Sequence, residues 1–177
     1  MKGIINKIRR KRWEIVGRSE LKRQINGLTK TKSPIKIILG ASHVTPSMDG
    51  WVKTDLPQFD ITNEEHWKII FGKNKVNNFL IEHVLEHLTL EQNKIFFAIA
   101  KRYLQQQGNI RIAVPDGFHT NPEYINFVKP NGNGPGCEDH KLLWNIDLMN
   151  SIASEFNFRI TKLEYFDKAG KLSLIHI

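Results

Sequence analysis

The side chains of this sequence that can do chemistry lie at the ends of its short apolar runs. A turn of small residues lets backbone N–H groups approach a ligand closely, and an acid can accept hydrogen bonds from both hydroxyls of an adenosine ribose. Histidine and carboxylate side chains can move a proton near neutral pH. The residues that directly follow the apolar runs are Gly40, Ala41 and Ser42, then Asp55, then Glu82 and His83, and then Asp116, Gly117 and Phe118.

Further candidates lie in the stretches after these positions. Asp60 and Ile61 form a short acidic-apolar pair, which can hold the amino group and the ring of an adenine, or can equally form a turn or a helix cap. His119, Asp139 and His140 lie in a long polar segment. The imidazole of His140 is a candidate general base, and a role at the start of a helix is the competing interpretation.

A metal site is the rival hypothesis. His83-Val84-Leu85-Glu86-His87 matches H-x-x-E-H, a zinc peptidase motif in which both histidines bind the ion and the glutamate is the base. Glu164 is the candidate third ligand. The motif must lie within one helix so that residues four apart share a face, whereas here it follows an apolar strand. A role of these residues in capping the next helix is the alternative.

The apolar patterns predict alternating strands and helices. Alternation of this kind is typical of an α/β fold. We expect a Rossmann-like, mostly parallel sheet with helices on both faces and a C-terminal antiparallel hairpin. Because ligands of such sheets bind beyond the carboxyl ends of the strands, this fold would gather the candidate residues at one edge. The predicted strands are Ile35–Leu39, Trp51–Thr54, Val76–Ile81 and Ile110–Val114; the predicted helices are Asn63–Phe71, Leu90–Gln107 and Asp147–Phe156; a loop covers Asp116–Asp139, and the hairpin pairs Arg159–Tyr165 with Lys171–His176.

Positive charge is concentrated at the N-terminus. Residues 1–33 carry 11 basic and 2 acidic side chains, whereas residues 34–177 carry 15 basic and 16 acidic ones. We therefore expect a basic helical arm over 1–33 and an α/β domain over 34–177. The pattern predicts a helix interrupted at Gly17 and a second short helix that Ser19 caps and that stops at Asn26-Gly27.

Such an arm can meet nucleic acid or an anionic membrane surface, and a solvated helix without a ligand is the alternative. No apolar run reaches the roughly 18 residues that span a bilayer, and the charged start does not resemble a signal peptide. Because Cys137 is the single cysteine, a disulfide within the chain is excluded. We therefore expect a cytoplasmic protein. Peripheral attachment to the membrane through the arm is the alternative.

Four segments together resemble a known family. KIILGAS, GWVKTDL, FLIEHVLEHLTLEQ and GNIRIAVPDGFH are similar to class I S-adenosylmethionine-dependent methyltransferases, in particular to a small type 11-like group. The resemblance covers about Ile35 to Ile177, and the pair EHVLEHL and RIAVPDG is its most specific part. For the cofactor, the resemblance implies contacts of Gly40, Ala41 and Ser42 with the methionine part, of Asp55 with the ribose, and of Asp60 and Ile61 with the adenine. Glu82 and His83 would contact both the cofactor and the substrate. The residues that would contact the substrate alone are Asp116, Phe118, His119, Asp139 and His140.

The sequence also departs from that family. One glycine replaces the usual GxGxG, and only ten residues, Ala41 to Gly50, join the first two predicted strands. A parallel crossover normally needs a dozen or more, so the first helix should be a stub or absent. The expected function is methyl transfer from S-adenosylmethionine to a small molecule or a cell-envelope saccharide, without a metal and with His140 and His83 as candidate bases. A non-catalytic binding protein of the same fold, acting through the basic arm, and the zinc peptidase remain alternatives.

Overall fold

The structure is a computed structural model that describes residues 2–42 and 45–174 of the 177, with side chains in the first helix described from residue 11. The chain forms two compact units. Unit 1 consists of Met1–Ile81 and Arg102–Ile112, and unit 2 consists of Glu82–Lys101 and Ala113–Ile177. No helix in the described ranges combines the length and the apolar composition needed to cross a membrane.

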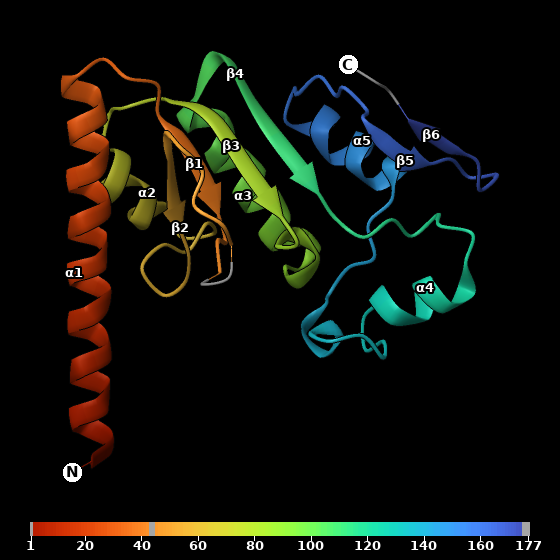
Figure 1. Ribbon diagram of the computed structural model, residues 1–177, viewed down its shortest axis with the longest axis horizontal. Coiled ribbons are helices and arrows are strands. Elements are labelled where there is room, and N and C mark those ends of the chain that lie inside the picture. The colour runs from red at the N-terminus through yellow and green to blue at the C-terminus, as the bar shows by residue number, and fades with distance from the viewer. Residues whose placement is uncertain (1, 43–44, 175–177) are drawn as a thin grey trace. The chain divides into compact units, whose positions relative to one another are not determined.

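Unit 1 is built on a four-stranded sheet (Figure 1). Its strands are β1 (Lys36–Leu39), β2 (Trp51–Thr54), β3 (Val76–Glu82) and β4 (Leu104–Ala113), in the order β2-β1-β3-β4. Strand β1 pairs in parallel with both of its neighbours, and three of its four residues are buried. The predicted mostly parallel α/β fold is confirmed. Between β1 and β2 the described residues, 40–42 and 45–50, contain no helix, as the short connection predicted.

Helix α1 (Lys2–Lys30) runs without interruption and packs along α2 (Glu64–Phe71) (Figure 1). The predicted break at Gly17 and the predicted stop at Asn26-Gly27 are wrong. A Cβ at Gly17 would collide with Cγ of Gln58, so the glycine allows the Gln58 side chain to approach the helix closely. The hydroxyl of Ser19 donates to the carbonyl of Ile15 one turn back, instead of capping a new helix.

Burial explains why α1 continues through its glycines. Leu21 and Ile25 are buried in unit 1, and Ile25 is fully enclosed. Burying one such side chain contributes roughly 1.5–3 kcal/mol, whereas a glycine in a helix costs about 1 kcal/mol relative to alanine. The C-terminal half of the basic segment therefore forms part of the core of unit 1.

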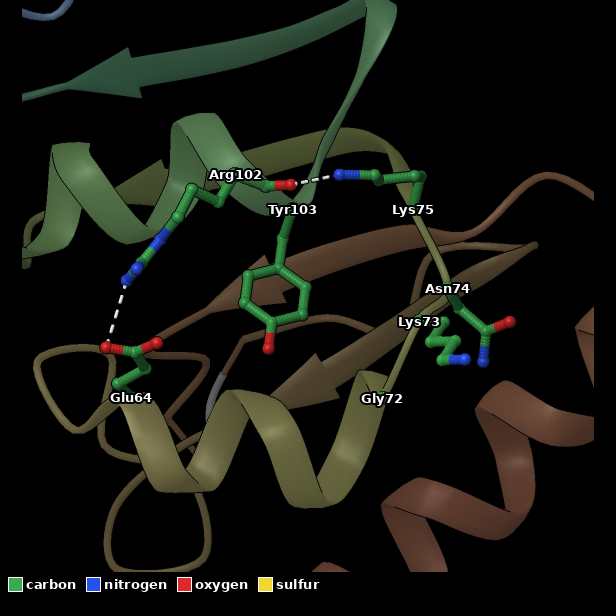
Figure 2. Close-up of a pocket in the computed structure, with 7 residues that line it drawn as sticks. All are labelled: Glu64, Gly72, Lys73, Asn74, Lys75, Arg102 and Tyr103. Atoms are coloured by element: carbon green, nitrogen blue, oxygen red, sulfur yellow. Dashed lines mark hydrogen bonds and ion pairs between the residues drawn. The ribbon is translucent and has the colours of Figure 1, made fainter.

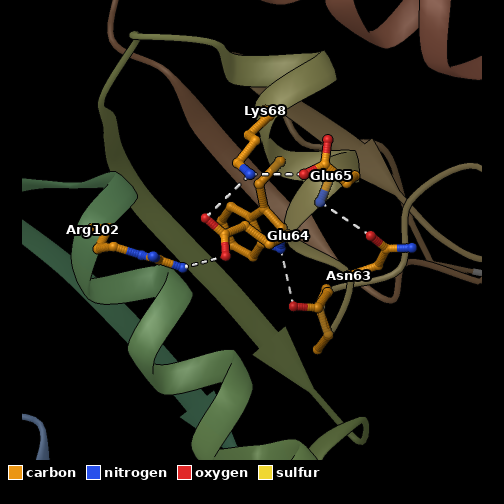
Figure 3. Close-up of polar contacts among 7 residues, drawn as sticks. Asn63, Glu64, Glu65, Lys68 and Arg102 are labelled. Atoms are coloured by element: carbon orange, nitrogen blue, oxygen red, sulfur yellow. Dashed lines mark hydrogen bonds and ion pairs between the residues drawn. The ribbon is translucent and has the colours of Figure 1, made fainter.

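Helix α2 carries an aromatic cluster onto the sheet. Asn63, predicted as the first helical residue, instead caps the helix by accepting the N–H of Glu65, and Gly72 ends it at φ 58°. On the outer side, the Lys68 ammonium contacts the carboxylates of Glu64 and Glu65 (Figure 3). The rings that pack edge-on or tilted around Trp67, with centroids 5.0 to 5.5 Å from its own, are Phe59, Phe71, Phe79 and Tyr103.

Unit 2 contains the remaining elements. The helix predicted to end at Gln107 ends at Tyr103, since the following residues already belong to β4. The predicted long loop contains helix α4, which Asn121 caps and Pro122 begins. The C-terminal hairpin forms a two-stranded antiparallel sheet of its own. The elements are η1 (Leu85–His87), α3 (Leu90–Tyr103), α4 (Pro122–Val128), η2 (Cys137–Asp139), α5 (Ile146–Glu155), β5 (Glu164–Phe166) and β6 (Leu172–Leu174).

Candidate functional site

The carboxyl ends of β1 and β2 bring a glycine turn and an acid together in unit 1. Leu39 is the register partner of Thr54, so the residues that follow them, Gly40 and Asp55, are neighbours at the same edge of the sheet. Gly40 has φ 68°, a left-handed conformation that favours glycine. The N–H of Ala41 donates to the carbonyl of Thr54 at 2.8 Å, which fixes the turn against β2.

The carboxylate of Asp55 is held in place and remains partly exposed. Its Oδ1 accepts the N–H of Leu56 at 2.8 Å. Ser42 contributes a hydroxyl to the same edge, 3.5 Å from the hydroxyl of Thr45. An oriented carboxylate beside a turn without bulky side chains can bind a diol while the backbone approaches the rest of the ligand.

Asp60 and Ile61 have structural contacts within unit 1. Oδ1 of Asp60 accepts both the N–H and the hydroxyl of Thr62, at 2.8 and 2.7 Å. Ile61 is buried, and its carbonyl accepts the indole N–H of Trp67 at 3.0 Å. These contacts give the pair a turn and a core function at the base of the loop that follows Asp55.

His66 is a neighbour that sequence reasoning did not single out. The N–H of Asp60 donates to its Nδ1 at 2.9 Å, and the Arg18 guanidinium lies against its Nε2. Burial, followed by the positive charge of Arg18, lowers the pKa of His66 below its ordinary value. This imidazole therefore links α2 to Arg18 of α1 and to the loop that precedes α2.

A cavity of about 220 Å³ lies at the opposite edge of the sheet (Figure 2). Its lining residues 72–75 directly precede β3, and Arg102 and Tyr103 directly precede β4. Arg102 contacts Glu64 at 3.1 Å, and the Lys75 ammonium donates to the Arg102 carbonyl. The cavity therefore lies at the amino ends of the strands. Open α/β sheets bind their ligands at the carboxyl ends, which is where Gly40 and Asp55 lie, so the two sites are separate.

In unit 2, the H-x-x-E-H segment does not form an α-helix. Only Leu85–His87 form a helical turn, of the 3-10 type, and His83 has a left-handed backbone with φ 54°. His83 is 72% exposed, whereas Glu86 is 1% exposed, and Nδ1 of the first lies 3.2 Å from Oε1 of the second. The helical face that the peptidase motif requires is therefore absent from this segment, and the zinc peptidase hypothesis loses its structural basis.

Backbone hydrogen bonds connect the H-x-x-E-H segment to the segment that follows His140. The carbonyl of Glu86 accepts the N–H groups of Lys141 and Leu142, at 2.7 and 3.2 Å. This contact places the rings of His87 and His140 edge to face with centroids 4.6 Å apart. His87 was considered only as part of the peptidase motif, because nothing in the local sequence relates it to His140.

Asp116 and its neighbours form a second polar cluster in unit 2. The two oxygens of Asp116 accept the N–H groups of Phe118 and Phe166, at 2.9 and 2.7 Å, so this acid ties the loop to β5. The ring of His119 packs on Tyr124 and Phe166, with centroids 4.1 and 4.5 Å away. Burial raises the pKa of Tyr124.

Two other predicted residues flank these groups. Glu82 is exposed at the end of β3, and Asp139 is exposed at the end of η2. Each unit thus brings part of the predicted set together: Gly40, Ala41, Ser42 and Asp55 in unit 1, and His83 and His140 around Glu86 in unit 2.

The fold can be compared with known structures. The chain is similar to the crystal structure of a SAM dependent methyltransferase from Archaeoglobus fulgidus, with 17% sequence identity, a TM-score of 0.52, and coverage of 90% of this chain and 79% of that chain. The two proteins share an α/β, Rossmann-like fold. No protein-family model and no curated protein matches the sequence. The smaller type 11-like group suggested by the sequence motifs stays a prediction.

Proposed function

We propose that this protein is an S-adenosylmethionine-dependent methyltransferase acting on a small molecule or a cell-envelope saccharide. The observation that carries the proposal is that Gly40 and Asp55 lie next to each other, at the carboxyl ends of two neighbouring parallel strands. The likeness to a solved methyltransferase of the same fold adds support.

The residues at this edge fit the cofactor. The absence of a side chain at Gly40 lets the backbone after β1 approach a ligand, and the carboxylate of Asp55 can accept hydrogen bonds from two ribose hydroxyls. When bound, the cofactor supplies an electrophilic methyl group on a sulfonium. The described residues of the connection between β1 and β2, 40–42 and 45–50, form no helix beside this edge.

The protein must also orient the acceptor and take its proton. Two imidazoles of unit 2 are candidates, His83 and His140. Nδ1 of His83 contacts the buried Glu86 carboxylate, which orients the ring and leaves Nε2 for the acceptor. In His140, Nδ1 lies 2.7 Å from the Val128 carbonyl, so Nε2 again carries the lone pair. A positioned base of this kind contributes roughly 10²–10⁴-fold to the rate, and we propose Asp116, Phe118, His119 and Asp139 as residues that shape the acceptor site.

Calorimetric titration with S-adenosylmethionine and with its demethylated product tests the proposal. We expect saturable binding that Asp55→Ala weakens by roughly 10- to 150-fold, because charge-assisted hydrogen bonds contribute about 1.5–3 kcal/mol. Asp49→Ala is the matched control, since this aspartate is exposed in the preceding loop. Absence of binding would instead favour a non-catalytic protein of the same fold, and equal effects of the two substitutions would remove Asp55 from the site.

A second function is favoured by the surface of α1. Trp13 is 56% exposed, and Ile15 and Val16 are exposed as well, among the exposed basic side chains of Lys11 and Arg12. Basic side chains are attracted to an anionic membrane surface, and tryptophan is favoured at the membrane interface. We propose that this half of α1 attaches the protein peripherally to such a membrane.

Co-sedimentation with phosphatidylserine vesicles tests the attachment. We expect binding that falls with salt and with Trp13→Ala, whereas neutral phosphatidylcholine vesicles bind weakly. Unchanged sedimentation of the variant, or stronger binding to a DNA duplex than to either vesicle, would contradict the membrane proposal.

A further inference from the structure

We propose that unit 2 binds a zinc ion through Glu86, His87 and His140. A ligand atom of each residue lies within 4.8 Å of a ligand atom of the other two. This set differs from the H-x-x-E-H motif, because it leaves out His83 and takes its third ligand from the segment after η2. The proposal does not require methyl transfer, but it removes His140 from the two candidate bases.

The spacing suits a small ion. Zinc binds histidine nitrogen and carboxylate oxygen at about 2.0–2.2 Å in a tetrahedral arrangement, which holds neighbouring ligand atoms roughly 3.3 Å apart. The widest pair in the cluster would need to close by about 1.5 Å at most, a movement that side-chain rotation can supply. The backbone framework is already fixed, since the Glu86 carbonyl accepts the N–H groups of both Lys141 and Leu142.

Glu86 supplies the observation that points to a ligand. Its side chain is 1% exposed, and among the described residues Oε2 has no hydrogen-bond partner. Oε1 is 3.2 Å from Nδ1 of His83. An ionised carboxylate is costly to bury unless it is paired or bound to a metal. An ion held by Oε2 would satisfy the remaining oxygen.

His140 has the second contact that metal-binding histidines usually make. Its Nδ1 lies 2.7 Å from the carbonyl of Val128, and because a carbonyl can only accept, Nδ1 must carry the proton. The lone pair is therefore on Nε2. Metal-ligating histidines almost always donate their other N–H in this manner, which fixes the tautomer and the orientation of the ring.

The donor set decides the class of ion. Calcium and magnesium favour oxygen ligands, whereas two imidazoles and one carboxylate with a fourth position open are the ligands of known zinc sites. That fourth position would take a water molecule or a substrate oxygen. An ion on Nε2 occupies the lone pair that a general base needs, so this proposal leaves His83 as the candidate base.

The test is direct titration of the full-length, tag-free protein after removal of metal by a chelator. Zinc binding is followed by calorimetry, and cobalt binding by the visible absorption of a tetrahedral Co²⁺ site. We expect one ion per chain, and at least a tenfold loss of affinity in each of Glu86→Gln, His87→Gln and His140→Gln, since even outer-sphere partners contribute about 10–100-fold. His119→Gln is the matched control, because this imidazole of unit 2 packs on Tyr124 and Phe166 and its replacement should keep the site.

Several outcomes would overturn the proposal. They are no saturable binding, equal affinity in His140→Gln and the unaltered chain, and loss of binding in His83→Gln with retention in His140→Gln, which would point to the sequence motif instead. Far-UV circular dichroism of each variant identifies loss of fold. For any variant that does not fold, the rise in the melting temperature of the unaltered chain with zinc, and its absence with magnesium, provides the decisive measurement.

Discussion

Replacement of Ile25 by alanine tests whether α1 is an integral part of unit 1. Ile25 is 0% exposed in the structure, whereas Ile15, ten residues earlier on the same helix, is 53% exposed. Both positions lie within α1 and can take the same substitution. The pair therefore separates the effect of burial from the effect of the amino-acid type.

The expected magnitudes follow from burial and helix propensity. Truncation of a buried isoleucine to alanine costs about 2–5 kcal/mol, and the better helix propensity of alanine returns about 0.4 kcal/mol. The net loss in the free energy of unfolding for Ile25→Ala is thus about 1.6–4.6 kcal/mol, or roughly 3–18 °C in melting temperature for a protein of this size. For Ile15→Ala only the propensity remains, which predicts no change or a gain of about 0.4 kcal/mol.

Urea denaturation at constant pH, followed by far-UV circular dichroism, measures both variants against the unaltered chain. A loss below about 0.5 kcal/mol for Ile25→Ala, the usual range for surface substitutions, would mean that α1 is not packed on unit 1 in solution. Equal losses at both positions would refute burial as the cause. Either result would support a detachable arm over residues 1–33.

Two further predictions concern unit 1. Since burial and the charge of Arg18 lower the pKa of His66, the unfolded chain binds a proton more readily, so the His66 contribution to stability is complete above about pH 6.5 and falls as the pH drops toward the folded-state pKa. The pH dependence of urea unfolding between pH 7 and 5 should be shallower in His66→Gln, and an unchanged slope would contradict this. Gly108→Ala should cost about 1–3 kcal/mol by overpacking, because its Cβ would lie 2.7 Å from the carbonyl oxygen of Asn77. Gly27→Ala, with nothing within 4 Å of the added Cβ, should add about 0.5–1 kcal/mol; a melting-temperature shift of the same sign in both variants would show that contact with Asn77 is not decisive.

Local patterns predicted much of unit 1. Strand β2 has the predicted bounds Trp51–Thr54, and α2 (Glu64–Phe71) begins one residue after its predicted start and ends where predicted. The errors arose where distant contacts outweigh local preference. The glutamines after Tyr103 favour a helix, yet Gln105 lies in β4, where its side chain accepts a hydrogen bond from Asn77 on β3 at 2.6 Å.

Helix α4 was missed although its signal was present. Asn121-Pro122-Glu123 carries the cap, the proline of the first turn and the acid that favour a helix start, but the surrounding glycines and prolines pointed to a loop.

The candidate site was also predictable only in part. Gly40 and Asp55 become neighbours because they end adjacent parallel strands, and alternation of strands and helices reveals such ends. The proximity of His87 to His140 depends instead on the backbone contacts of Glu86 with Lys141 and Leu142, which no local pattern encodes. The sequence motif grouped His87 with His83, and the fold groups it with His140.

The division of the chain has a consequence for its synthesis. Unit 1 consists of two segments, Met1–Ile81 and Arg102–Ile112, and the residues between them, Glu82–Lys101, belong to unit 2. The ribosome must therefore synthesise this part of unit 2 before β4 can pair with β3. At roughly 5–20 residues per second, the 22 residues from Glu82 to Tyr103 take roughly 1–4 seconds to translate. During that interval β3 is an unpaired edge strand, a template for pairing with other chains. Slow translation between Glu82 and Tyr103 would prolong this interval, so the speed of the ribosome over that stretch should govern the yield of soluble protein.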